Sequence, residues 1–142
     1  MHEWIEEAKD LGGTVLTGGY YEGAIYQPTL LANVPKHARC VSCELFAPVT
    51  ILFSYQNFEQ AIEEVNDSVY GLQAGVFTKD ITKIMRAFNR LEVGGVMINE
   101  VPTFRVDNFP YGGIKDSGLG REGVKYAIEE MTELKVMVLH NE

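Results

Sequence analysis

The sequence has little positive charge. Its 142 residues include 12 lysines and arginines against 20 aspartates and glutamates, which gives a formal net charge of −8. Nucleic acids and anionic membrane surfaces repel a chain of this charge, so neither is expected as its main partner. A cation that faces a ligand would therefore stand out in this sequence.

Cysteine is also scarce. The sequence contains two, Cys40 and Cys43, in the segment C-V-S-C. A structural zinc site needs about four ligands, so a second pair of Cys or His is missing. A thioredoxin-type pair opens a helix directly after a strand, and residues 35–39 do not have the pattern of a strand. We therefore expect two reduced thiols without a catalytic role, and no metal site.

Long apolar runs are missing too, and none could cross a membrane. The first residues, M-H-E-W-I-E-E-A-K-D, are acidic and amphipathic, unlike the basic and apolar start of a secretory signal peptide. We therefore expect a cytoplasmic protein. The hydrophobic share of 46% and the charged share of 23% are those of an ordinary globular domain with a core.

The middle of the chain alternates between strand and helix patterns. Segment 48–55 is a continuous apolar, β-branched run, which is typical of a strand buried on both faces, and segments 74–78 and 93–99 are further strand candidates. Between them lie two amphipathic helices, capped by Asn57 and Asp80. This order with short links predicts an α/β fold, in which crossover helices cover a parallel sheet.

The two predicted helices each carry an apolar stripe. In the first, Gln60 adds the spacing of a capping box to the Asn57 cap. The stripes consist of Phe58, Ala61, Ile62 and Val65 in the first helix, and of Ile81, Ile84, Met85, Phe88 and Leu91 in the second.

Other patterns occur toward the ends of the chain. Residues 2–11 have the pattern of a helix that Gly12 and Gly13 end. The segment L-K-V-M-V-L-H at 134–140 alternates enough to be a strand. Residues 100–123 are rich in glycine and lack periodicity, and a loop of that length is usually functional.

The segment S-G-L-G-R-E-G at 117–123 contains the spacing G-x-G-x-x-G of dinucleotide-binding turns. Such a turn follows directly on a strand, so that the pyrophosphate lies at a helix N-terminus. The residues before Gly118, P-Y-G-G-I-K-D-S, do not have the pattern of a strand. We therefore interpret these glycines as serving backbone geometry and not phosphate binding.

Several longer segments carry more specific information. They are E-L-F-A-P-V (44–49), N-D-S-V-Y-G-L-Q-A-G-V-F-T-K-D (66–80), G-G-V-M-I-N (94–99), P-Y-G-G-I-K-D-S-G-L-G-R-E-G (110–123) and Y-A-I-E-E-M-T-E-L-K-V-M-V (126–138). Together, in this order and spacing, they resemble the C-terminal part of the catalytic domain of NAD(P)-dependent aldehyde dehydrogenases. The version P-T-F-R-V-D-N-F-P-Y-G-G-I-K-D-S-G-L-G-R-E-G at 102–123 resembles in particular the lactaldehyde, phosphonoacetaldehyde and non-phosphorylating glyceraldehyde-phosphate branches.

The resemblance implies a fold and a domain organisation. Subunits of that family have a Rossmann-like cofactor domain, an α/β catalytic domain and a small β oligomerisation element. By resemblance, residues 1–133 are a part of the catalytic domain, with αβα layers around a parallel sheet. Residues 134–142 would be the oligomerisation strand, so a homo-oligomer is expected.

The resemblance also implies site residues. Glu44 would accept hydrogen bonds from the ribose hydroxyls of NAD or NADP, which suits its two carboxylate oxygens, and Phe46 would lie beside the nicotinamide. Arg105 would contact the phosphate or carboxylate of an anionic aldehyde, and Tyr111 would line the aldehyde tunnel. The alternatives are a solvated acid for Glu44, a core anchor for Phe46, a surface position or a salt bridge to Asp107 for Arg105, and loop packing for Tyr111.

The same resemblance implies the reaction. In the family a cysteine attacks the aldehyde, hydride passes to NAD(P)+, and water activated by a glutamate releases the acid. The family places that cysteine, that glutamate and the cofactor domain upstream of Met1. We therefore expect no catalytic residue in this chain, which would be an inactive part of an oxidoreductase for a small aldehyde. The alternative is a truncated, non-catalytic homologue that acts as a folded interaction module. The residues that match structural positions of the family are Asn99, Gly112, Gly113, Lys115, Arg121 and Glu122.

Overall fold

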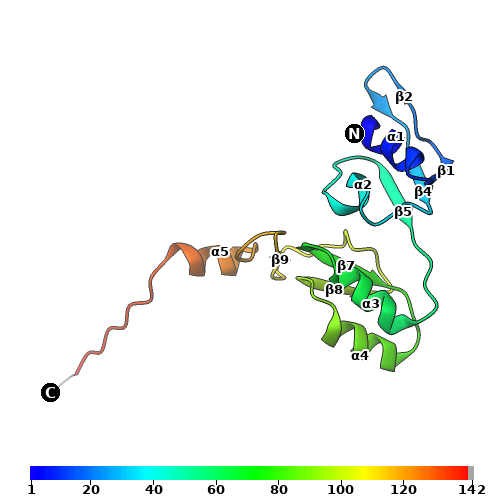
Figure 1. Cartoon of the computed structure of the whole chain (residues 1–142). Helices are drawn as coiled ribbons and strands as arrows, with labels where there is room; N and C mark the ends of the chain where they lie inside the picture. The colour runs from blue at the N-terminus through cyan, green and yellow to red at the C-terminus, as the bar shows by residue number, and fades with distance from the viewer. Residues whose placement is uncertain (141–142) are drawn as a thin grey trace. The chain divides into compact units, whose positions relative to one another are not determined.

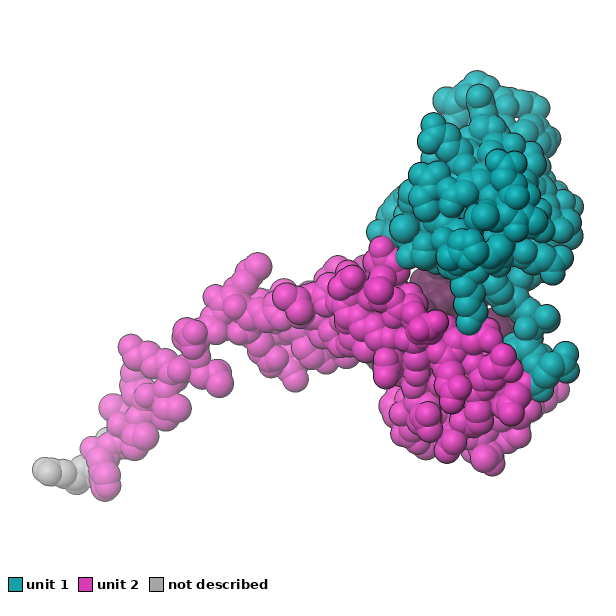
Figure 2. All heavy atoms as spheres, in the orientation of Figure 1, with its two compact units in different colours: residues 1–56 teal, residues 57–142 magenta. Residues whose placement is uncertain are grey.

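The computed structural model describes residues 1–140. They form two compact units, of which the first is Met1–Gln56 and the second begins at Asn57 (Figure 2). The boundary between the units falls inside the range 1–133 that the resemblance assigns to one partial domain, and that assignment stays a prediction. Among the described residues, no helix is both long and apolar enough to span a membrane.

The first unit is built around a three-stranded sheet of order β1-β4-β5. Its middle strand, β4, is antiparallel to β1 and parallel to β5, while β2 and β3 pair as a separate antiparallel hairpin (Figure 1). The elements of this unit are α1 (His2–Asp10), β1 (Thr14–Thr17), β2 (Tyr21–Glu22), β3 (Ile25–Tyr26), β4 (Thr29–Ala32), α2 (Arg39–Ser42) and β5 (Val49–Leu52).

The core of the first unit forms where α1 contacts the sheet. Ile5 and Ala8 of α1 are 0% and 1% exposed, and they share one cluster with Leu31 of β4 and with Val34. The helix predicted for residues 2–11 is confirmed. It ends where Gly12 has a φ of 95°, in the left-handed region that favours glycine.

The second unit alternates between helices and strands. β7 and β8 pair in parallel and α4 connects them (Figure 1). β6 and β9 form a short antiparallel pair. The elements are α3 (Phe58–Asn66), β6 (Tyr70–Gly71), β7 (Gln73–Val76), α4 (Ile81–Arg90), β8 (Gly95–Ile98), β9 (Ile114–Lys115) and α5 (Val124–Met131).

Both predicted helix caps are confirmed. The Oδ1 atom of Asn57 accepts a hydrogen bond of 2.8 Å from the backbone N–H of Glu59. Oδ1 of Asp80 accepts from the second and third residues of α4, at 2.8 and 3.3 Å. These bonds satisfy N–H groups that have no partner inside the helix. Among the described residues, the Asn57 N–H has no hydrogen bond to Gln60, whose side-chain amide donates to Glu64, so the capping box is not formed.

The strand pairing differs from the expected single parallel sheet. β5 pairs with β4 in the first unit, and β7 pairs with β8 in the second. The α/β class and the parallel crossover through α4 are confirmed. A hydrophobic pattern identifies a buried strand, but its partner depends on contacts with distant segments. The sequence therefore located these strands without fixing their neighbours.

The apolar stripe of α4 is largely uncovered. Ile81, Met85 and Phe88 are 67%, 52% and 65% exposed, although Ala87 on the same helix is fully buried. Among the described residues of the second unit, Ile62 and Ala87 are the buried hydrophobic ones. The core of this unit is therefore small for its length, and its helices expose apolar surface.

Residues 132–140 follow α5 without a strand assignment. The apolar side chains Leu134, Val136 and Val138 are at least 82% exposed there. A strand needs a hydrogen-bonding neighbour, and none is present among residues 1–140. The oligomerisation strand at 134–142 therefore stays a prediction, and residues 141–142 lie outside the described part.

Candidate functional site

Arg105, Tyr111 and Glu122 form one cluster in the second unit. Nη2 of Arg105 donates a hydrogen bond of 2.8 Å to Oε2 of Glu122, and Cζ of Arg105 lies 4.4 Å from the centroid of the Tyr111 ring. Tyr111 and Glu122 exchange two backbone hydrogen bonds, of 3.1 and 2.6 Å. The ion-pair partner of Arg105 is thus Glu122, and not Asp107.

This cluster borders a cavity of about 230 Å³. One side of the cavity is β8 with Gln73 of β7, and the other is formed by the loop segments 104–106 and 109–112. Arg105 is the charged residue in a lining that is otherwise uncharged and rich in aromatic and aliphatic groups. A single cation in such a lining is suited to orient a small anionic molecule.

Two aromatic residues of this lining were not predicted as site residues from the sequence. Phe104 and Phe109 flank Arg105 in the segment T-F-R-V-D-N-F-P, and both line the cavity. Their spacing around the arginine was the available signal. Glu122 was expected to be structural, and its contact with Arg105 depends on loop geometry that the sequence does not encode locally.

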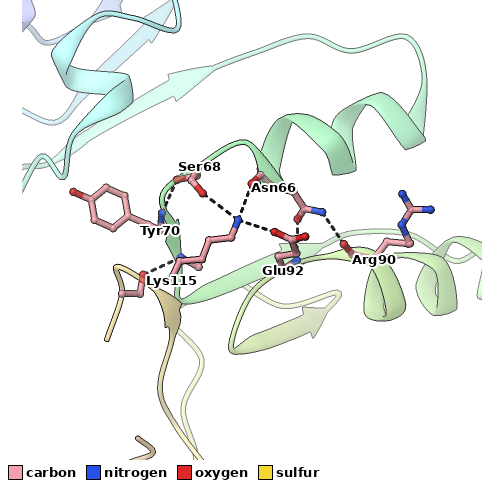
Figure 3. A network of polar contacts seen from close by, with 8 residues as sticks. Asn66, Ser68, Tyr70, Arg90, Glu92 and Lys115 are labelled. Carbon is pink, nitrogen blue, oxygen red and sulfur yellow. Dashed lines mark hydrogen bonds and ion pairs between the residues drawn. The ribbon is translucent and has the colours of Figure 1, made fainter. Parts of the chain in front are cut away.

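Lys115 fixes the strand that follows the cavity lining (Figure 3). Its Nζ atom donates to the backbone carbonyls of Asn66 and Ser68, at 2.7 and 3.1 Å, and lies 2.9 Å from Oε2 of Glu92. The Asn66 side chain donates to the carbonyl of Arg90 and accepts from the N–H of Glu92. These bonds satisfy carbonyls at the C-terminal ends of α3 and α4 and hold β9 in place.

Glycines allow the close approach of backbone segments around the cavity. A Cβ atom at Gly94 would overlap the carbonyl oxygen of Gly112, so only glycine fits at the start of β8. In the G-x-G-x-x-G segment, Gly118, Gly120 and Gly123 all have positive φ angles, of 129°, 73° and 121°. These glycines serve backbone geometry, as the sequence analysis indicated.

Side chains of the same segment also hold the loop. Nη1 of Arg121 donates to the carbonyls of Gly113 and Gly120, at 3.0 and 2.6 Å. Oγ of Ser117 accepts a hydrogen bond of 2.9 Å from the N–H of Gly71 in β6. The loop that carries Tyr111 is therefore tied to β6 and to its own backbone.

Glu44 and Phe46 lie in the first unit, in the loop that follows α2. Glu44 is exposed, and its carboxylate has no hydrogen bond or ion pair with any residue in the range 1–140. Phe46 is 93% exposed, so it does not anchor the core. Both side chains are therefore open to solvent, and their role as cofactor contacts stays a prediction.

The two cysteines differ in their surroundings. Cys40 is buried in the core cluster, and burial raises the pKa of its thiol above the ordinary value. Cys43 is exposed, and its sulfur lies 3.8 Å from Oγ of Ser42. Within residues 1–140, no group of three or more His, Cys, Asp or Glu could hold a metal ion.

A comparison with protein families identifies the family to which these motifs belong. The profile described as "Aldehyde dehydrogenase family" matches residues 1–137. The chain belongs to the aldehyde dehydrogenase family. It is 46% identical over 140 residues to the 3-sulfolactaldehyde dehydrogenase of Priestia megaterium, and 47% identical over 137 residues to a lactaldehyde dehydrogenase of Methanococcus maripaludis. These matches cover 99% and 96% of this chain but 29% of each relative.

Solved structures of the aldehyde dehydrogenase family agree with the fold. Aldehyde dehydrogenase 21 from Physcomitrella patens, in complex with the product succinate, matches with a TM-score of 0.94 and 49% identity, over 99% of this chain and 29% of that one. The glyceraldehyde-3-phosphate dehydrogenase GapN from Methanocaldococcus jannaschii, complexed with NADP, matches with a TM-score of 0.87 and 46% identity, over 94% and 29%. The chain therefore has the fold of one segment of an aldehyde dehydrogenase.

Proposed function

We propose that this chain forms part of an enzyme that oxidises a small, negatively charged aldehyde to its acid with NAD or NADP. The observation that carries the proposal is Arg105, stacked on Tyr111 at the edge of an uncharged cavity. A guanidinium offers several N–H donors to a sulfonate, carboxylate or phosphate group. Relatives named for 3-sulfolactaldehyde and sulfoacetaldehyde, and the succinate complex of a relative, support an anionic substrate.

In this proposal, the second unit holds the aldehyde. Arg105 binds the anionic end of the substrate, while Tyr111, Phe104 and Phe109 surround its carbon chain with apolar surface. Excluding water there would protect a thioester from early hydrolysis. A cysteine outside these 142 residues would supply the nucleophile, because Cys40 is buried and the Cys43 sulfur contacts the Ser42 hydroxyl, which is not a base.

The first unit would contact the cofactor. Glu44 would accept hydrogen bonds from the ribose hydroxyls, and Phe46 would pack beside the nicotinamide, which accepts the hydride. Both side chains are exposed and available for these contacts. The NADP complex of a relative supports this class of cofactor.

We also propose that the chain associates with copies of itself through residues 134–140. Their apolar side chains are exposed and their backbone lacks a paired strand within the described part. Such a segment adds readily to the edge of another sheet.

The test is a chimera, in which this chain replaces the matching 140 residues of the Priestia megaterium enzyme. Arg105→Leu should lower kcat/KM for 3-sulfolactaldehyde about 10- to 100-fold, because a charge-assisted hydrogen bond is lost. For neutral lactaldehyde the change should stay below about threefold. Arg90→Leu, which removes an exposed arginine of α4, is the matched control. An equal loss on both aldehydes with Arg105→Leu would contradict the proposal.

The cofactor contact has its own test in the same chimera. Glu44→Gln should slow the hydride-transfer step more than it changes KM for the aldehyde, because it disturbs the ribose and not the substrate. Pre-steady-state NADH formation measures that step. The opposite pattern, an altered KM with unchanged hydride transfer, would argue against a cofactor role for Glu44.

A further inference from the structure

We infer that Glu122 makes the Arg105 site selective for singly charged over doubly charged ligands. The inference rests on the proposed function, because it takes Arg105 as the anion contact. In this inference Glu122 sets which class of aldehyde is preferred. An aldehyde that carries a carboxylate or sulfonate group binds better than one that carries a phosphate dianion.

The geometry leaves part of the guanidinium available. Glu122 engages Nη2, and the Tyr111 ring covers one face, while Nε and Nη1 of Arg105 have no recorded partner among residues 1–140. Arg105 lines the cavity and Glu122 does not. A ligand in the cavity can therefore contact Arg105 while Glu122 remains bound to its other side.

The position of Glu122 is held by the backbone. Its N–H and C=O both bond to Tyr111, at 2.6 and 3.1 Å, so the carboxylate stays close to the ring that carries Arg105. The arginine side chain is 47% exposed and that of Glu122 is 64% exposed, so the pair sits at the rim of the cavity. A ligand group at the free edge of Arg105 would lie within a few ångströms of a fixed negative charge.

The net charge of the site follows from this pairing. Arg105 and Glu122 together are neutral, so a bound monoanion leaves one negative charge and a bound dianion leaves two. Arg121, whose Nη1 donates to the backbone carbonyls of Gly113 and Gly120, is not among the residues that line the cavity. Asp107 and Lys125 line a different cavity, beside α5. The second charge of a dianion is therefore repelled by Glu122 without a further cation in the lining to compensate.

The experiment compares two anions that differ by one charge and share tetrahedral sulfur-bound oxygens. Methanesulfonate and sulfate are titrated into the 15N-labelled 142-residue chain at constant low ionic strength, and the amide shifts of residues 104–122 are followed. In the unsubstituted chain, sulfate should bind no more tightly than methanesulfonate. In Glu122→Gln the amide oxygen still accepts from Nη2 but the charge is gone, so sulfate should gain about tenfold over methanesulfonate.

Two variants separate charge selection from other roles of Glu122. Glu63→Gln removes the same charge from an exposed site on α3 and should leave the ratio of the two affinities unchanged. Glu122→Ala removes both the charge and the acceptor. If Glu122 only orients Arg105, Glu122→Ala weakens both anions and Glu122→Gln leaves their ratio unchanged, and that result would overturn the inference.

Arg105→Leu distinguishes this inference from the function beneath it. If Arg105→Leu abolishes binding of both anions and Glu122→Gln changes the ratio of their affinities, the proposed function and this inference are both supported. If Arg105→Leu abolishes binding of both anions but Glu122→Gln leaves the ratio of their affinities unchanged, the inference is overturned and the proposed function is not. Anion shifts that persist in Arg105→Leu, or the lack of any saturable shift in the unsubstituted chain, count against Arg105 as the anion contact and so against both.

Discussion

Lys115 and Glu92 form an ion pair, with Nζ 2.9 Å from Oε2, that connects β9 to the link before β8 (Figure 3). The same Nζ donates to the carbonyls of Asn66 and Ser68, and the side chain of Lys115 is only 25% exposed. One lysine thus joins the end of α3, the link before β8 and the strand that follows Tyr111. The loop that carries the candidate site depends on this contact for its position.

Lys115→Met should destabilise this part of the second unit by about 1–2 kcal/mol, because it leaves two carbonyls and one carboxylate without their donor. Amide hydrogen exchange of Asp116 measures the effect, because its N–H donates to the carbonyl of Val69 beside the β6–β9 pair. Lys125→Met, at a side chain that is 75% exposed, is the control and should change exchange little. Unchanged protection at β6–β9 in Lys115→Met would mean that the network does not hold the strand.

The stability of the first unit should depend on pH through Glu7. Arg39, first through its backbone N–H and then through its guanidinium, holds the pKa of Glu7 below the ordinary value of 4.5. The unfolded chain then binds more protons than the folded chain as the pH falls below about 4.5. The contribution of this pair is therefore present above that pH and is lost as the pH falls through the lowered pKa.

The corresponding variant is Glu7→Gln. Between about pH 6 and about pH 3, it should lose less unfolding free energy than the unsubstituted chain, as measured by urea denaturation at each pH. Identical pH profiles for Glu7→Gln and the unsubstituted chain would show that the Arg39 contact is not kept in solution.

The two thiols should differ in reactivity. Cys40 is 7% exposed and burial raises its pKa, whereas Cys43 is exposed. Iodoacetamide should therefore modify Cys43 at least about tenfold faster than Cys40 near neutral pH, as followed by peptide mass spectrometry. Cys43→Ser should leave one slow site. Equal rates at both positions would indicate that the core around Cys40 opens easily.

The isolated chain should self-associate at micromolar concentration, measured by light scattering after size exclusion. A double variant with Val136→Lys and Val138→Lys should reduce the association, because charged side chains disfavour strand addition. Met85→Lys on the exposed stripe of α4 is the informative control, since it removes a different apolar contact. A sharp monomer peak for the unsubstituted chain, or association that depends on Met85 instead, would contradict a role of residues 134–140.

Local features were predictable because their causes lie within a few residues. Asn57 and Asp80 cap their helices through N–H groups two or three positions ahead, and Gly12 ends α1 through its own backbone. The alternation of strand and helix indicated the α/β class, since periodicity is a property of each segment alone. The motifs identified the family because a set of short patterns in fixed order is specific even where each one is weak.

Tertiary structure decided what connects distant residues. Glu122 meets Arg105 from 17 residues away, and Lys115 reaches Asn66 from 49 residues away. Such contacts depend on the path of an irregular loop, which has no periodicity from which to derive it. Tertiary structure also decided which strand pairs with β5 and how exposed Ile81, Met85 and Phe88 are. Strand pairing and side-chain exposure depend on which surfaces of the folded chain face one another. The order of polar and apolar residues does not determine which surfaces those are.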